Sequence, residues 1–314
     1  MKTILATKGF LSTLAIAAAA VTAQAQPTAP LAGTYRLVVV DGPQGASADL
    51  TGINNHRQVA GYESNAGIGS PVLLGLFGDV NGTADVVVPG STWTQLSAIN
   101  DDGVAAGGAK VGQGPCEGVH AILYDGSGTI TVLPDFAPSG TCNVGKAVDS
   151  RGRVLGNSYA HDYSTFLNWI WDPRAGFSNV PPVAGAIFTT AYDMNDDDTI
   201  VGEADFEESP SAGFVMNGSS TTLIAVPGAF FSTSQGINRH GDIVGFYYGP
   251  SLDPPNEVAF HGYLLHHGVM STVDVPQAVG WTLLQSINDR GDLAGQYCDD
   301  TACHGFVMLR GDSA

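Results

Sequence analysis

One phrase recurs six times along the chain: an Ile-Asn step, a short turn and a strand that ends in glycine. Its clearest copies begin at Ile237-Asn238 and Ile287-Asn288, and the six anchor positions are 53, 99, 148, 194, 237 and 287. Neighbouring anchors are 43 to 50 residues apart. Self-similarity at such a period is typical of repeat architectures, in which each copy is one structural unit. The chain is therefore expected to contain six copies of one unit.

Each unit carries signals for four β-strands. The fifth unit shows them well: a strand that ends at the anchor, then residues 242–247, 261–264 and 273–276, the last stopped by proline. Runs of Val, Ile, Thr and aromatic residues between Gly, Asn and Pro clusters predict strands, and helical periodicity is absent. Four strands in about 45 residues is the size of a propeller blade.

The two ends of the chain predict how the ring closes. The sixth unit stops after its third strand, near Met308-Leu309, whereas residues 35–43 have the fourth-strand pattern ahead of the first anchor. Pairing these two strands would cover an open sheet edge. We predict an all-β fold, a six-bladed β-propeller of four-stranded blades, closed by an N-terminal strand that pairs into the last blade. The propeller would be a single domain at residues 33–310, with a tail at 311–314.

Residues 1–25 have the pattern of a secretory signal peptide. Lys2 and Lys8 flank the start of an apolar run, and Ala23-Gln24-Ala25 is a small-x-small cleavage site. The apolar run is shorter than the roughly 20 residues that a membrane helix needs. We expect cleavage after Ala25, a short linker at 26–32, and a mature protein in the periplasm or the medium with no membrane span.

The four cysteines fit that oxidising location as two disulfides. They contain no Cys-x-x-Cys pair that would indicate zinc. In a propeller, the loops after the second and the fourth strand of a blade lie on the same face, which favours the pairs Cys116–Cys142 and Cys298–Cys303 over the other connectivities.

The repeated phrase Ile-Asn-x-x-Gly-x-(Val/Ile)-(Val/Ala)-Gly, followed by His-Gly-(Phe/Tyr) and Val-Pro, resembles the bacterial extracellular repeat proteins of the HAF family. The resemblance covers nearly the whole chain after the leader, although units one, three and four lack the His. It implies secretion and a repeated fold. It brings no catalytic residues that could be transferred to this chain.

Charge narrows the choice of partners. Twelve basic residues stand against thirty acidic ones, and the formal net charge is −18. A strongly acidic protein is repelled by nucleic acid and by anionic lipid. We expect no nucleic-acid partner, a monomer, and a small-molecule or glycan ligand if there is one.

A large aromatic residue stands six positions before the anchor in four of the six units. These residues are Trp93, Phe188, Phe231 and Trp281. They are expected on the face opposite the Asn turns, where aromatic rings stack against sugars and other flat ligands. The alternative is that they fill the wedge between neighbouring blades, which is the more frequent use of a regular repeat position.

Residues that break the repeat just before the anchors are Lys146, Tyr192 and Asp193. A lone lysine in an acidic channel would hold a carboxylate or an anionic sugar; the alternative is an ion pair between Lys146 and Asp193. The same three residues are the visible candidates for catalysis if the protein is a hydrolase or a lyase that acts on a carbohydrate or a lactone in the channel.

The Asp-rich turns raise the question of a metal. Turns such as Asn195-Asp196-Asp197-Asp198 cluster carboxylates, but a calcium loop spreads its ligands over about a dozen residues. Asn and Asp also hydrogen-bond the backbone of their own turns. We assign these residues to turn structure, with calcium as the alternative, and assign no metal site or cofactor. A secreted binding module is the favoured function, and the channel enzyme is the alternative.

Overall fold

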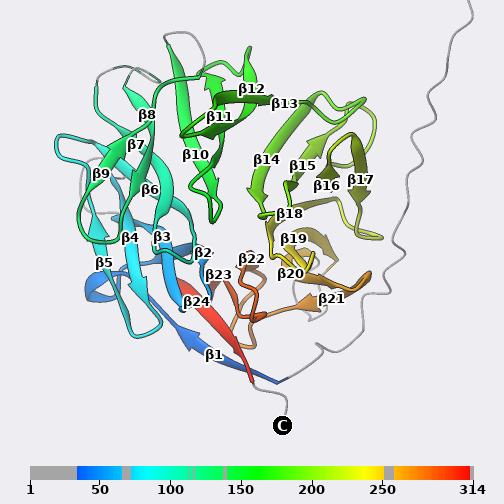
Figure 1. Cartoon of the computed structure of the whole chain (residues 1–314). Coiled ribbons are helices and arrows are strands. Elements are labelled where there is room, and N and C mark those ends of the chain that lie inside the picture. The colour runs from blue at the N-terminus through cyan, green and yellow to red at the C-terminus, as the bar shows by residue number, and fades with distance from the viewer. Residues whose placement is uncertain are drawn as a thin grey trace, which may run out of the picture.

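The computed structural model describes residues 34–65, 72–112, 114, 116, 118–136, 140–250 and 258–311. Its twenty-four described strands form six four-stranded antiparallel sheets around a central axis (Figure 1). The predicted six-bladed β-propeller is therefore confirmed. The predicted signal peptide, the linker and residues 312–314 of the predicted tail lie outside the described residues.

In every blade the strand nearest the axis comes first in its run of strands, and the chain then moves outward. Blade 1 contains β2 (Ala48–Ile53), β3 (Gln58–Asn65), β4 (Val72–Asp79) and β5 (Gly82–Val86). Blade 2 contains β6 (Trp93–Ile99), β7 (Ala105–Lys110), β8 (Val119–Tyr124) and β9 (Ile130–Val132). Blade 3 contains β10 (Thr141–Val148), β11 (Val154–Ala160), β12 (Phe166–Asp172) and β13 (Gly176–Val180).

The second half of the ring follows the same order. Blade 4 contains β14 (Phe188–Met194), β15 (Thr199–Asp205), β16 (Ala212–Asn217) and β17 (Ser220–Ile224). Blade 5 contains β18 (Phe231–Ile237), β19 (Ile243–Pro250), β20 (Val258–His266) and β21 (Val269–Val273). Blade 6 contains β22 (Thr282–Ile287), β23 (Leu293–Cys298) and β24 (Cys303–Arg310), with β1 (Tyr35–Val39) as its outermost strand.

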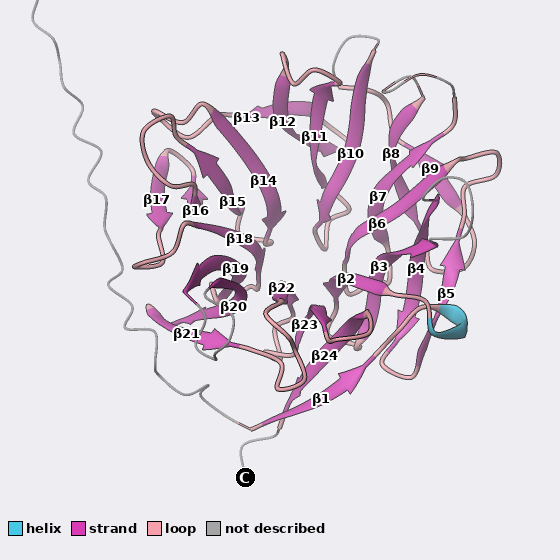
Figure 2. Ribbon diagram, turned by 180° about the vertical axis from the view of Figure 1, so that it is seen from behind, coloured by secondary structure: helices cyan, strands magenta, loops and turns pink. Residues whose placement is uncertain are grey.

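Strand β1 closes the ring as predicted. It pairs antiparallel with β24 from Tyr35 opposite Arg310 to Val39 opposite Phe306, and the two strands lie side by side in both ribbon views (Figure 2). The N–H of Gly311 donates to the carbonyl oxygen of Thr34 at 2.8 Å, which extends the ladder by one step. Blade 6 is thus assembled from both ends of the described chain.

The core is divided among the six junctions between neighbouring blades. At one junction Leu155 of blade 3 packs with Phe214 of blade 4, and at another Leu50 of blade 1 packs with Val307 of blade 6. Each blade therefore buries both faces only because it has a neighbour on each side. Repeat proteins gain stability from such interfaces, because a single repeat cannot bury its own apolar surface.

Helical structure is nearly absent from the described residues. A single short 3-10 turn, η1 (Pro43–Gly45), connects β1 to β2. Within the part of the chain that the structure describes, no helix has the length and apolar character needed to cross a membrane.

Candidate functional site

Each innermost strand carries a β-bulge at the same place, two residues before the anchor. A bulge leaves one residue outside the ladder and redirects its side chain. All six bulged residues line the central channel, and each is partly exposed. They are Thr51, Ser97, Lys146, Tyr192, Gln235 and Gln285.

This ring of six side chains lies between two chambers of the channel. The turn-side chamber is also lined by the Asn turns that follow the innermost strands. The loop-side chamber has a volume of about 290 Å³, and Asp49, Phe246 and Leu283 complete its wall. The six ring residues are of five types, with glutamine in both blade 5 and blade 6, so the repeat fixes their positions but not their chemistry.

Lys146 places an ammonium group in the channel. Its Nζ lies 5.7 Å from the centre of the Tyr192 ring, within the range of a cation–π contact. Burial lowers the pKa of Lys146, and no neighbouring carboxylate acts against that shift. Among the described residues no ion pair includes Lys146, so the predicted pair with Asp193 is wrong.

Asp193 instead joins two blades. Its Oδ2 accepts a hydrogen bond from the N–H of Ile237 in blade 5 at 2.9 Å, and its Oδ1 accepts one from Met194 at 2.8 Å. The Oγ of Ser286, which has the same place in blade 6, accepts the N–H of Ile53 at 3.2 Å. Burial raises the pKa of Asp193 to about 7, against the two N–H donors that lower it. Asp193 therefore differs in residue type from the other units, but its side chain accepts the same kind of blade-to-blade hydrogen bond as Ser286.

Two carboxyl groups stand beside the ring of bulged residues. Asp49 accepts hydrogen bonds from the hydroxyl of Tyr62 at 2.6 Å and from the amide of Gln285. Glu203 lies 3.4 Å from the hydroxyl of Tyr192, which donates to it. Burial raises the pKa of Asp49 to about 6 and that of Glu203 to about 7, and it holds the pKa of Tyr192 above its usual range. Tyr192 is therefore a neutral phenol at physiological pH.

Ser97 is, after Lys146, the second member of this ring whose hydrogen-bond donor has no partner among the described residues. Its Oγ is buried and has no hydrogen-bond partner among the described residues. The other polar members are engaged: Thr51 donates to the carbonyl oxygen of Leu96 at 2.9 Å, and Gln235 donates to Thr233 at 2.8 Å. The unpartnered hydroxyl of blade 2 and the unpaired ammonium of blade 3 thus occupy neighbouring positions around the axis.

The Asn turns form a second ring, on the turn side. In blade 6 the Asn288 Oδ1 accepts the N–H groups of Arg290 and Asp292 at 3.0 and 2.9 Å, which fixes the turn. Its Nδ2 donates to the carbonyl oxygen of Asn54 in blade 1 at 2.9 Å, and Asn54 donates onward to Asn100 at 2.9 Å. The structural role predicted for the turns is confirmed.

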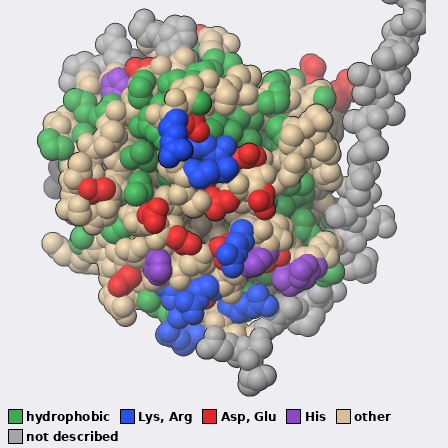
Figure 3. Space-filling model, in the orientation of Figure 1, with side chains coloured by type: hydrophobic (Ala, Val, Ile, Leu, Met, Phe, Trp, Pro, Cys, Tyr) green, Lys and Arg blue, Asp and Glu red, His purple; other side chains and the backbone are tan. Residues whose placement is uncertain are grey.

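Charged side chains surround a hollow at the centre of the face seen in Figure 3. Charged residues of the Asn turns take part in hydrogen bonds and ion pairs: Asp101 accepts the N–H of Asn55 in the turn of blade 1 at 2.8 Å, and Arg153 pairs with Asp149 of its own turn at 2.7 Å. Within the described residues, no three His, Cys, Asp or Glu side chains are grouped as a metal ion would require. Asp101 and Asp149 thus have identified hydrogen-bond and ion-pair partners.

The four predicted aromatic residues pack against other side chains and do not line the loop-side chamber. Trp93 packs beside Cys142 and Val144 of blade 3. Trp281 lies 4.3 Å from Phe260 of blade 5, centre to centre. Phe231 lies 5.9 Å from the same Phe260 within blade 5, whereas Phe188 is 5.9 Å from Phe166 of the preceding blade. Packing contacts therefore account for all four, and ligand contact stays a prediction.

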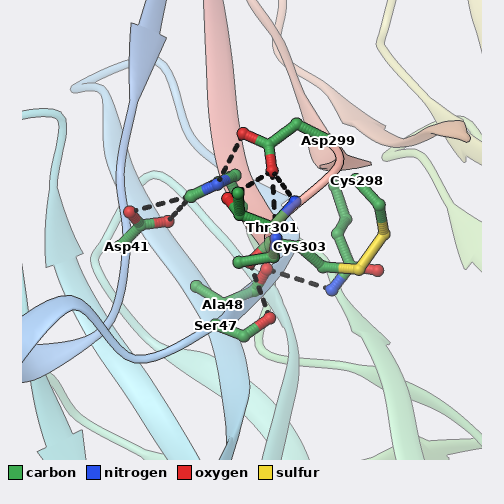
Figure 4. Close-up of a disulfide and its surroundings, with 10 residues drawn as sticks. Asp41, Ser47, Ala48, Cys298, Asp299, Thr301 and Cys303 are labelled. Carbon is green, nitrogen blue, oxygen red and sulfur yellow. Dashed lines mark hydrogen bonds and ion pairs between the residues drawn. A yellow bond between two sulfur atoms is a disulfide. The ribbon is translucent and has the colours of Figure 1, made fainter. Parts of the chain in front are cut away.

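Both disulfides have the predicted pairing, Cys116–Cys142 and Cys298–Cys303. The surroundings of the second are shown in Figure 4, where the hydroxyl of Ser47 donates to the carbonyl oxygen of Cys303 at 2.7 Å. The adjacent His304 pairs with Asp41 at 3.1 Å and with Asp299 at 3.3 Å. This disulfide thus braces the loop of blade 6 where it meets the segment that leads into blade 1.

Of the residues that line the loop-side chamber, Lys146 and Tyr192 were predicted from the sequence, whereas Asp49, Phe246, Leu283 and the other four bulged residues were not. Asp49 and Leu283 stand two positions before the bulged residues of their strands, so counting back along the strand would have found them. Phe246 comes from β19, and nothing in the repeated phrase marks it as a channel residue. The bulged residues themselves were recognisable, because they precede the anchors at constant spacing.

The raised carboxyl pKa values predict an unusual pH dependence of stability. Asp49, Asp193 and Glu203 bind protons more tightly when folded than when unfolded, so their contribution rises as the pH falls from about 8 to about 5. At about 1.4 kcal/mol per pH unit, each group contributes on the order of 2 kcal/mol, and the Tm should rise by about 5 °C or more. Melting curves across this range test the sign. Asp49→Asn should reduce the rise, whereas the control Asp172→Asn should not, because hydrogen bonds from backbone N–H groups lower the pKa of Asp172. A flat or falling Tm would contradict the assignment.

Comparison with protein-family models gives no match, and comparison with curated protein sequences gives none. Solved structures do match. A protein of unknown function from Dyadobacter fermentans has a TM-score of 0.54 at 10% identity, covering 89% of this chain and 99% of that one. The putative TolB of Agrobacterium tumefaciens has a TM-score of 0.53 at 14% identity, covering 89% and 91%.

A third similar structure is the SapL1 lectin in complex with alpha methyl fucoside. Its TM-score is 0.51 at 14% identity, covering 85% of this chain and 94% of that one. At such low identities the likeness concerns the fold alone. The chain therefore shares the β-propeller fold with these proteins.

Proposed function

We propose that this protein is an extracytoplasmic binding propeller that holds a small carboxylate-bearing ligand, such as an acidic sugar, in the loop-side chamber. The observation that carries the proposal is the ammonium of Lys146, enclosed in the channel without a carboxylate partner among the described residues. An unpaired buried charge is costly, and a ligand carboxylate would compensate it.

The rest of the chamber suits the same ligand. The hydroxyl of Ser97 can donate to the second carboxylate oxygen, because its Oγ has no other partner among the described residues. Gln235 and Gln285 offer amide groups for ligand hydroxyls, and the rings of Tyr192 and Phe246 offer flat apolar surface. A chamber of about 290 Å³ is large enough for one small ligand.

The location outside the cytoplasm rests on other observations. Two disulfides are typical of proteins in oxidising compartments. The leader pattern that ends at Ala25 and the resemblance to HAF-repeat proteins support a periplasmic or secreted protein. SapL1, a lectin of the same fold, was solved with a sugar glycoside, which is consistent with a glycan ligand here.

Titration calorimetry with D-glucuronate and D-galacturonate, against D-glucose and D-galactose, tests the proposal. Wild-type protein is expected to bind a uronate more tightly than its neutral counterpart, and the added affinity should depend on Lys146. Lys146→Gln should weaken this binding by about 10- to 100-fold, the usual loss for a hydrogen bond to a charged group. Lys110→Gln removes a lysine at the end of β7 and is the matched control. An unchanged uronate affinity in Lys146→Gln, or a neutral-sugar affinity that falls in this variant as much as the uronate affinity, would defeat the proposal.

A hydrolase or lyase is the second candidate function. The observation in its favour is that three titratable side chains, Asp49, Lys146 and Tyr192, line the loop-side chamber. Asp49, with a pKa of about 6, is suited to proton transfer near neutral pH. Chemical analysis of a bound sugar or lactone after incubation separates the two functions. A product that Asp49→Asn no longer forms would indicate an enzyme, and unchanged ligand would indicate a binding protein.

A further inference from the structure

We infer that a second ligand site, for a neutral sugar ring, lies between blades 3 and 4. A pocket of about 300 Å³ opens at this junction, away from the channel, and we call it the junction pocket. Its wall includes Tyr163, Ser164, Phe166, Asn179, Ile187 and Phe188. The site goes beyond the proposed channel function, because it shares no lining residue with the loop-side chamber.

The residue at one repeat position differs between the blade junctions. Phe188 stands at the same place in its blade as Trp281, which at the junction of blades 5 and 6 packs on Phe260 at 4.3 Å. At the junction of blades 2 and 3 that place belongs to Cys142, which is bonded to Cys116 and packed beside Trp93. An indole or a disulfide therefore occupies the equivalent position at these two junctions, whereas blade 5 has Phe231 and blade 1 has Ser47 there. The phenyl ring of Phe188 is smaller than an indole and lies in the wall of the junction pocket.

The wall of the pocket combines aromatic rings with uncharged polar groups. Phe166 meets Phe188 edge to face at 5.9 Å, and Tyr159 stacks with both Phe166 and Tyr163, at 5.9 and 5.7 Å. Sugar rings stack their C–H faces on such surfaces. The amide of Asn179 and the hydroxyl of Ser164 can bond ligand hydroxyls. Because no charged residue lines the pocket, it suits a neutral ligand.

Two large side chains of the pocket wall are more exposed to solvent than is usual for side chains with so much apolar surface. Tyr163 is 58% exposed and Ile187 is 60% exposed, although both are large and apolar in character. Tyr163 also has a left-handed backbone, with φ of 57°, and its N–H donates to the carbonyl oxygen of Ala160 at 2.9 Å. Bulky residues rarely adopt this conformation. The tight turn after β11 thus presents a tyrosine at the pocket, where Gly or Asn would form the turn at lower cost.

The experiment fills the pocket with the side chain that the repeat uses elsewhere. Phe188→Trp copies the residue found at position 281, and Phe231→Trp makes the same change at the aligned position of blade 5. Saturation-transfer NMR with methyl α-glycosides of glucose, galactose and mannose, and an array of neutral oligosaccharides, gives the readout. Wild type and Phe231→Trp are expected to bind a neutral sugar, and Phe188→Trp to bind it about tenfold or more weakly.

Tyr163→Ala changes an exposed side chain and serves as the second variant if Phe188→Trp does not fold. It should also weaken neutral-sugar binding. Uronate binding in the channel should persist in both variants and be lost in Lys146→Gln, so the two proposals fail separately. Absence of any neutral-sugar signal in the wild type, or wild-type signals in Phe188→Trp or Tyr163→Ala, would overturn the inference.

Discussion

Deletion of residues 34–41, which contain β1, is expected to abolish cooperative folding and to cause aggregation. The deletion removes a five-residue ladder and leaves the edge of β24 unpaired from Phe306 to Arg310. It also removes Val40 from the core between blades 1 and 6, and Asp41, which pairs with His304. An unpaired, apolar strand edge is a template for intermolecular pairing. Circular dichroism melting and size-exclusion chromatography measure the effect.

A circular permutant provides the matched control. Thr34 and Gly311 are joined by a hydrogen bond of 2.8 Å, so residues 34–41 can follow residue 311 through a short glycine-rich linker. The permutant contains the same strands and only changes the position of the chain ends. It should melt like the wild type. A truncated protein that melts cooperatively at the wild-type temperature would show that β1 does not close the ring.

The repeat explains why the architecture could be predicted from the sequence. In blade 5, Asn238 caps its own turn through hydrogen bonds from residues two and four positions later, and such local chemistry is visible in the residues themselves. Counting strands along the sequence then showed that the last unit lacks its fourth strand and that one extra strand precedes the first anchor. This count predicted how the ring closes. The prediction of disulfide pairs followed from the same order of strands and loops, and it was confirmed.

The direction of individual side chains could not be predicted in the same way. Lys146 occupies the bulged position of β10, whereas Asp193 follows the bulged residue of β14. The bulged residue faces the channel, and the following residue reaches the neighbouring blade. A one-residue difference in a bulged strand therefore separates a candidate ligand group from a structural connector. Only the register of the folded sheet makes this visible.

Double replacement Trp93→Ala with Trp281→Ala is expected to cost about 3 kcal/mol at each position and to lower the Tm by about 10 °C or more. Trp93 packs with the apolar groups beside the Cys116–Cys142 disulfide, and a Cβ on Gly108 would lie 3.0 Å from the indole, so the ring covers that glycine. Trp281 covers Phe260. Thermal melts of the single and double variants measure the loss, and uronate binding should be retained, because neither residue lines the loop-side chamber.

Phenylalanine at position 281 separates packing from ligand contact. The Nε1 of Trp281 is buried and has no hydrogen-bond partner among the described residues, so the indole N–H contributes a desolvation cost and no bond. Trp281→Phe should keep most of the contact with Phe260 and lose less than about 1 kcal/mol. If Trp281 binds a ligand through its N–H, the same variant would lose that binding at nearly unchanged stability. A stable Trp93→Ala and Trp281→Ala protein without sugar binding would likewise show that these rings serve the ligand and not the blade junctions.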